Sequence, residues 1–306
     1  MSILQMFAAA RGPLVIALCA VLWGTVGIAV LQLYQLGNIV PAAIGFYRLS
    51  LAAVLLGALC CAFRKCLPSG RDLAVVALMG AAQAAYQGCY FVAVRESGVV
   101  VAALVTLCMA PLWVAALSAA LWRERLGWRA RGALLLALAG TVLLISAPGN
   151  TGADIRGALW ACGSALGYAV FVLAGRTLAD RHDPLSVTAP AFGVGALLLL
   201  PLAGPSGVAV VLPAEGWAIV LYLGALPTAL AYLLFMDALR VTSATLASTV
   251  TLLEPLVSTL LAALVFGERL GAGGWLGAAL LLAALVALTR LEQTRAAPTI
   301  PVTSTR

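Results

Sequence analysis

Apolar runs about as long as a bilayer is thick recur along the whole chain of 306 residues, and they constrain the fold more than any other feature. A helix that crosses a membrane needs about 20 mostly apolar residues. The runs of this kind are 13–34, 41–62, 71–93, 98–121, 128–147, 154–176, 184–203, 213–236, 242–265 and 272–290. With 63% hydrophobic and 9% charged residues, we expect an all-α membrane protein of ten transmembrane helices, because a helix satisfies its own backbone in lipid.

Basic side chains are concentrated in alternate connections, and they predict the orientation because Lys and Arg are retained on the cytoplasmic side. If the N-terminus is inside, the inside segments carry Arg11, Arg64, Lys65, Arg71, Arg123, Arg125, Arg129, Arg131, Arg176, Arg181, Arg240, Arg290, Arg295 and Arg306. The opposite side carries only Arg95, Arg156 and Arg269. Both termini are therefore expected to be cytoplasmic, with 291–306 as a disordered cytoplasmic tail.

The tetrapeptide Glu-Arg-Leu-Gly occurs at 124–127 and again at 268–271, each time after a proline, Pro111 or Pro255. This self-similarity predicts two five-helix repeats, 1–150 and 151–290. Because five is odd, the second repeat enters the membrane from the other side, so the repeats are inverted. Such folds place a substrate site near the bilayer midplane, between the halves. Both prolines are expected to kink their helices near mid-membrane.

Polar side chains inside the spans indicate which faces line a pathway. On the third expected helix, Gln83, Tyr86, Gln87 and Tyr90 are spaced i, i+3, i+4 and i+7, so they share one face. That face is expected to line a cavity. Hydrogen bonding that holds helices together is the alternative interpretation.

Aromatic residues on other expected helices extend this set. The candidates are Trp23 on the first helix, Trp160 and Tyr168 beside Ser164 on the sixth, and Tyr222 and Tyr232 on the eighth. Aromatic walls with a few amides suit a small amphipathic substrate. They also suit an organic cation, through cation–π attraction.

Two ionisable residues lie deep within the spans, Arg48 and Glu254. Arg48 is expected either to reach a substrate carboxylate or to bond backbone carbonyls as a clamp. Glu254 is costly near the bilayer centre. We therefore expect it to be held by the hydroxyls of Thr251 and Ser258, to be protonated and donate to the Thr251 carbonyl, or to pair with Arg48. Its counterpart in the first repeat is Ala110, so the architecture does not require it. A carboxyl that changes protonation as the cavity opens could couple protons to transport.

Several motifs together resemble the EamA-type members of the drug/metabolite transporter superfamily. They are A-x-x-W-G (Ala20, Trp23, Gly24), the arginine of FYRLSLAA, LEP in the ninth helix and the two P…ERLG endings. The resemblance covers 13–290 and implies a multi-pass carrier of the bacterial inner membrane. Its members are usually exporters of amino acids, other small metabolites or drugs.

Other functional classes fit less well. An enzyme within the membrane would need clustered bases or metal ligands, whereas the chain has one histidine, His182, in a loop; we expect no enzyme, no metal and no cofactor. The net charge of +7 is spread over loops without interleaved aromatics, which excludes nucleic acid as a partner. An organic-cation efflux carrier and a facilitative channel remain alternatives. Substrate identity and oligomeric state stay open.

Overall fold

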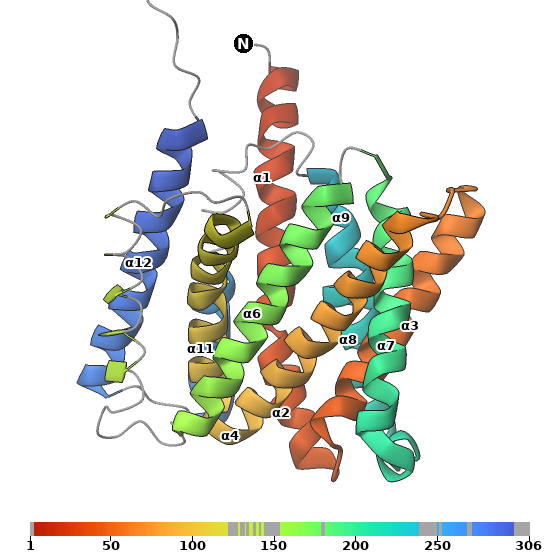
Figure 1. The fold of residues 1–306 in the computed structure, drawn as a ribbon. Coiled ribbons are helices and arrows are strands. Elements are labelled where there is room, and N and C mark those ends of the chain that lie inside the picture. The colour runs from red at the N-terminus through yellow and green to blue at the C-terminus, as the bar shows by residue number, and fades with distance from the viewer. Residues whose placement is uncertain are drawn as a thin grey trace, which may run out of the picture.

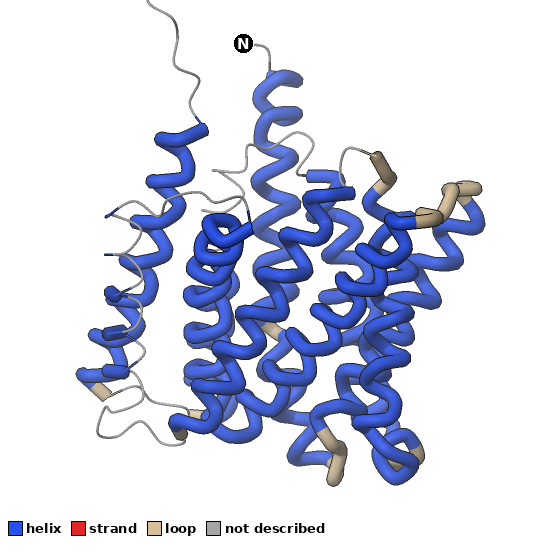
Figure 2. The backbone as a smooth tube through the Cα atoms, viewed as in Figure 1, coloured by secondary structure: helices blue, strands red, loops and turns tan. Residues whose placement is uncertain are grey.

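The described part of the chain is helical throughout, apart from its turns and connections. The computed structural model describes residues 3–121, 154–178, 181–238, 253–267 and 271–296, together with Val250 and scattered residues between 128 and 143. The helices are α1 (Ile3–Gly24), α2 (Val26–Leu36), α3 (Pro41–Ala62), α4 (Arg71–Leu121), α6 (Ile155–Leu178), α7 (Pro184–Val208), α8 (Ala214–Gly224), η1 (Ala225–Leu230), α9 (Ala231–Ala238), α11 (Leu253–Phe266) and α12 (Ala272–Ala296). They stand side by side in one bundle (Figures 1 and 2).

Within these described residues, 6 helical stretches are long and apolar enough to cross a membrane. They are Gly12–Leu36, Pro41–Ala62, Arg71–Val114, Ile155–Gly175, Pro184–Pro205 and Ala214–Phe235. A shorter apolar helix, Ala272–Ala284, falls in the tenth predicted span. The chain is therefore a multi-pass membrane protein, as predicted.

Some predictions fall on residues outside the described part. These are most of the span at 128–147, the tetrapeptide at 124–127, most of the Glu-Arg-Leu-Gly at 268–271, the stretch 242–252 apart from Val250, and the tail at 297–306. The count of ten spans thus stays a prediction. At the C-terminal end, α12 continues to Ala296, past Leu291, the predicted start of the tail.

Helix α4 turns at Gly98, which has φ 77° and ψ 171°. A positive φ is costly for a residue with a side chain, so glycine permits the turn. The two limbs correspond to the predicted spans 71–93 and 98–121. Figure 1 shows the orange limb descending to this turn and the olive limb rising from it. Since Gly98 is the residue of α4 with non-helical angles, the backbone angles stay helical at Pro111, a predicted kink.

The first predicted span is divided in its middle, between α1 and α2. Here the carbonyl oxygen of Gly24 accepts a 2.9 Å hydrogen bond from the Ser258 hydroxyl of α11. A Cβ built on Gly24 would lie 2.8 Å from Val257 and 3.0 Å from the Glu254 carbonyl oxygen. Glycine therefore lets α11 approach the break closely. The Trp-Gly motif of the first helix and the Leu-Glu-Pro motif of the ninth meet at this point.

Helix α4 packs closely on α6 and α7 because glycines remove the side chains between them. A Cβ on Gly167 of α6 would lie 2.7 Å from the backbone nitrogen of Tyr86, and one on Gly80 would lie 2.6 Å from the Ala191 carbonyl oxygen. These contacts fix the polar face of α4 against two neighbouring helices. That face is the one from which the site is built.

Candidate substrate site

The polar face of α4 points into the bundle, and the expectation that it lines a cavity stays a prediction. Gln83 and Gln87 are 0% exposed and Tyr90 is 8% exposed, while Tyr86 is half-buried. The Tyr86 ring lies 5.5 Å from the ring of Tyr168 on α6 and 6.5 Å from that of Tyr90, measured between centroids. Tyr86 and Tyr168 thus form an aromatic wall beside the two amides.

Gln83 and Gln87 are buried without hydrogen-bond partners. Within the described residues, neither the amide oxygen nor the amide nitrogen of either side chain has a partner at bonding geometry. The Tyr232 hydroxyl lies close to Gln83 but does not meet that geometry. A buried polar group left unpaired costs about 1–3 kcal/mol. Four such atoms lie on adjacent turns of one helix.

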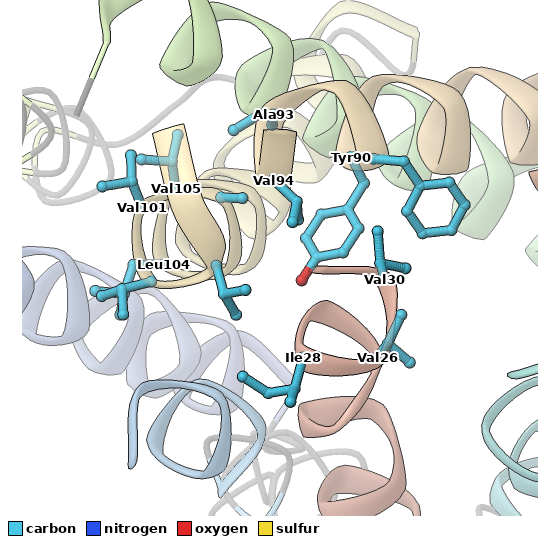
Figure 3. Packing of buried hydrophobic residues seen from close by; sticks show 14 of the residues in the cluster. Val26, Ile28, Val30, Tyr90, Ala93, Val94, Val101, Leu104 and Val105 are labelled. Carbon is cyan, nitrogen blue, oxygen red and sulfur yellow. The ribbon is translucent and has the colours of Figure 1, made fainter. Parts of the chain in front are cut away.

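Tyr90 has a different environment from Tyr86. Its hydroxyl lies against α2, where a Cβ built on Gly27 would be 3.0 Å from it. Figure 3 shows the ring between Val94 of α4 and Val30 of α2, within the largest cluster of buried apolar residues. Packing against α2 accounts for much of its burial.

Arg48 of α3 lies in the same region and is 4% exposed. Its Nε donates a hydrogen bond to the hydroxyl of Thr228, and its Cζ lies 5.9 Å from the centroid of the Phe91 ring. The Glu254 carboxyl is within electrostatic reach of the guanidinium. Within the described residues, the hydrogen-bond partner of Arg48 is a side chain of another helical segment, Thr228.

Glu254 lies in the first turn of α11 and is half-buried. It is within electrostatic reach of Arg48, yet the two form no ion pair in the described part of the chain. The Ser258 hydroxyl, a predicted partner, instead donates to the Gly24 carbonyl. Thr251, the other predicted partner, is outside the described residues.

A π-helical segment, η1, interrupts the eighth predicted span between α8 and α9. Its Pro227 carbonyl accepts a 2.9 Å hydrogen bond from Trp23 Nε1, and Thr228 receives the bond from Arg48. Segments of this kind occur often at functional sites. Two predicted site residues from α1 and α3 are therefore anchored to one irregular segment.

Trp23 completes the site from α1. Its ring makes edge contacts with Tyr232 at 5.5 Å and with Phe235 at 5.1 Å, between centroids. Tyr232 in turn contacts Phe192 at 5.3 Å. Trp23 is half-buried. Part of its side chain packs against these rings, and part remains accessible.

Trp160 does not join these residues, because its side chain is 46% exposed. Ser164, one turn further along α6, donates a 2.9 Å hydrogen bond to the Tyr86 carbonyl. Tyr222 lies at a separate cavity of about 310 Å³ between α2, α8 and α11. Its hydroxyl is 2.5 Å from that of Thr25, which also lines this cavity.

Sequence reasoning missed Thr228 and Phe91, both in contact with Arg48. Phe91 is one apolar residue among many in its span, and nothing in its spacing distinguishes it. Thr228 carries a signal, since it follows Pro227 inside an apolar run. A proline there leaves a backbone carbonyl without its helical donor, and a neighbouring hydroxyl is a common substitute.

The sequence matches a known family twice, at 10–146 and at 155–290, and that family is described as the EamA-like transporter family. The chain belongs to the EamA-like transporter family. Membership confirms the resemblance drawn from the motifs. It identifies a transporter and not an enzyme.

Individual proteins support the same assignment. "Uncharacterized transporter YwfM" of Bacillus subtilis is 30% identical over 276 residues, which cover 90% of this chain and 93% of that protein. "Uncharacterized inner membrane transporter YicL" of Salmonella typhimurium is 24% identical over 295 residues, 94% of this chain and 97% of that protein. With the six apolar helices of the described residues and the EamA match, these transporter-named relatives indicate a multi-pass protein of the inner membrane.

A solved crystal structure shares the fold. It superposes with a TM-score of 0.65 at 22% sequence identity, and the superposition covers 94% of this chain and 99% of the chain in that structure. At that identity the likeness concerns the arrangement of the helices.

Proposed function

We propose that this EamA protein is a secondary transporter that exports small amphipathic metabolites, such as amino acids, by alternating access. The observation that carries the proposal is the buried Arg48 beside the two unpartnered amides of Gln83 and Gln87. A charge at this depth is costly, and intramembrane ionisable residues commonly mark substrate pathways. The aromatic wall of Tyr86 and Tyr168 supplies the apolar surface that an amphipathic molecule needs.

The charge of Arg48 favours a substrate that carries a carboxylate over a purely cationic one. A guanidinium attracts a carboxylate and can bind it through two parallel hydrogen bonds. It repels an organic cation, which disfavours the efflux of organic cations as the main function. Glu254, within electrostatic reach of Arg48, supplies an acidic group for a substrate ammonium or for a coupled proton.

The organisation of the chain supports alternating access. The two family matches fall in the proposed halves, 1–150 and 151–290, which we propose are inverted repeats around a central site. Ion pairs of Lys65 with Asp183 (2.8 Å) and of Arg181 with Asp72 (2.9 Å) connect the halves at one end of the bundle. His182 Nε2 is also within hydrogen-bond distance of Asp72, at 2.7 Å. A transporter of this type keeps one end closed while the other opens. Export is the direction that the family resemblance implies.

Counterflow in proteoliposomes tests the proposal. We would load vesicles with L-phenylalanine and follow the uptake of labelled L-phenylalanine, with 2-phenylethylamine, its decarboxylated amine, as the comparison. The carrier is expected to exchange labelled for unlabelled phenylalanine more efficiently than it exchanges the amine. Drainage of both labels would indicate a channel, a chemically changed product an enzyme, and preference for the amine an organic-cation carrier; each would contradict the proposal.

The Arg48→Gln variant makes the test specific to the site. We expect its exchange of phenylalanine to fall at least about tenfold, the loss of one charge-assisted interaction, with a smaller effect on the amine. Arg156→Gln is the matched control, because Arg156 is exposed at the start of α6. Equal losses for both probes in Arg48→Gln would assign the arginine a structural role.

A further inference from the structure

Pro227 leaves a vacant acceptor in the middle of a membrane-spanning segment. It lacks an N–H, so the carbonyl of Leu223, four residues earlier, loses its α-helical donor. The Thr228 hydroxyl lies 2.7 Å from that carbonyl oxygen and donates to it. The threonine thus replaces the hydrogen bond that proline removes, and it does so inside η1 (Ala225–Leu230), which is a π-helix.

This bond fixes which hydrogen-bonding roles the Thr228 hydroxyl can play. A hydroxyl has one proton to donate and two lone pairs, and here the proton is directed at the Leu223 carbonyl. The lone pairs remain, and Arg48 Nε donates to them. Thr228 is 0% exposed, so water does not compete for either bond. The hydroxyl therefore acts as a fixed acceptor aimed at Arg48.

The guanidinium of Arg48 is consequently held at one end. Within the described residues, its Nε is the nitrogen that has a hydrogen-bond partner, and the Phe91 ring lies 5.9 Å from its Cζ. Because the group is planar and rigid, fixing Nε fixes the direction of both terminal Nη groups. These two donors form the edge that matches the two oxygens of a carboxylate.

We propose that Thr228 is a positioning residue, which uses the irregular turn at Pro227 to orient Arg48 so that its two Nη groups bind a carboxylate of the substrate end-on. The inference rests on the proposed function for the substrate, while the orientation of Arg48 is a property of the protein alone. Thr228 does not need to touch the substrate. Its role is to make Arg48 selective for a planar two-oxygen anion.

Transport by the full-length protein tests the selectivity. Thr228→Val keeps the shape of the side chain but removes the acceptor, whereas Thr228→Ser keeps the hydroxyl. For Thr228→Val we expect a KM for L-phenylalanine raised about tenfold with a maximal rate within about twofold, and little change for 2-phenylethylamine. Thr228→Ser should behave like the wild type. Thr106→Val is the matched control, since Thr106 is a buried hydroxyl that donates to the Ala161 carbonyl away from Arg48.

A second measurement is independent of any substrate. In protein labelled with ¹⁵N-arginine in nanodiscs, Arg48 Nε–H should give a signal protected from hydrogen exchange, assigned by its loss in Arg48→Lys. The protection should persist in Thr228→Ser and Thr106→Val and disappear in Thr228→Val. Unchanged protection in Thr228→Val, or equal losses of both transport probes, would overturn the role of Thr228. If the wild type moves neither probe, the proposed function fails, and the exchange measurement still decides the inference.

Discussion

The Ser258 hydroxyl of α11 donates a 2.9 Å hydrogen bond to the carbonyl oxygen of Gly24, at the end of α1. That carbonyl is one of the last in α1, where helical acceptors lose their backbone donors. The bond therefore stabilises the break between α1 and α2 and fixes the start of α11 beside it. Trp23 and Glu254 are brought to the same region by this contact between distant parts of the chain.

The contact predicts that Gly24→Ala destabilises the protein. Its new Cβ would lie 2.8 Å from Val257, and overpacking of this kind costs about 1–3 kcal/mol. The thermal unfolding midpoint of purified protein in detergent should fall. Gly57→Ala is the control, because a Cβ there meets nothing within 4 Å, and it should leave the midpoint unchanged or raise it. A wild-type midpoint for Gly24→Ala would show that the contact is looser than described.

Tyr86 and Tyr90 are expected to respond differently to replacement. Tyr86→Ala removes part of the aromatic wall, so it should change the ratio of transport rates for phenylalanine and alanine while leaving protein abundance near the wild-type level. Tyr90→Ala removes packing against α2, and loss of a buried aromatic costs about 3–5 kcal/mol, so abundance and thermal stability should fall. Trp160→Ala, at an exposed position, should affect neither. If Tyr86→Ala slows all substrates equally, Tyr86 serves helix packing.

Glu254→Gln tests proton coupling. The glutamine keeps the shape and a donor but cannot exchange a proton, so exchange at equal pH should persist while acceleration by a pH gradient is lost. Counterflow with and without an imposed gradient measures both quantities. Glu215→Gln is the control, since Glu215 is exposed in the first turn of α8. Unaltered acceleration in Glu254→Gln would leave Glu254 a hydrogen-bonding residue without a role in coupling.

The distribution of basic residues predicts that both termini are cytoplasmic. A reporter that is active only in the cytoplasm should be active when fused after Arg295, whereas one active only in the periplasm should be silent there. The same pair fused at Ser69, in the connection between α3 and α4, should give the same result. Periplasmic activity after Arg295 would rule out an even number of spans with the N-terminus inside.

The sequence predicts the polar face of α4 and the deep position of Arg48 well. Both depend only on the periodicity of a single helix and on the apolar bilayer around it. Residues three or four apart return to the same face of a helix. A charged residue within an apolar run is costly and therefore stands out. Trp160 shows the limit of this reasoning. Residues spaced by four drift about 40° per step, so Trp160 lies about 80° from Tyr168 around α6 and is exposed.

Tertiary contacts account for what the sequence does not predict. Pro111 and Pro255 carry the recognisable motifs, yet the irregular turn that holds Arg48 is at Pro227. A proline can kink a helix, widen it locally or leave its geometry unchanged. The outcome depends on which group donates to the carbonyl that the proline frees, and here that group is the hydroxyl of Thr228. Likewise, Ser258 lies one turn from Glu254 and could bond it, but the approach of α1 provides a competing acceptor in Gly24.

The ion pairs between the two proposed halves gather at one end of the bundle, and their side chains are partly exposed: Lys65 is 39% and Arg181 57% accessible. Such charges are screened by dissolved salt over about 8 Å at physiological ionic strength. The central site, by contrast, is enclosed by apolar helices and feels little of this screening. Under the proposed alternating-access mechanism, the electrolyte on that one face of the membrane should therefore tune how readily this end of the bundle opens.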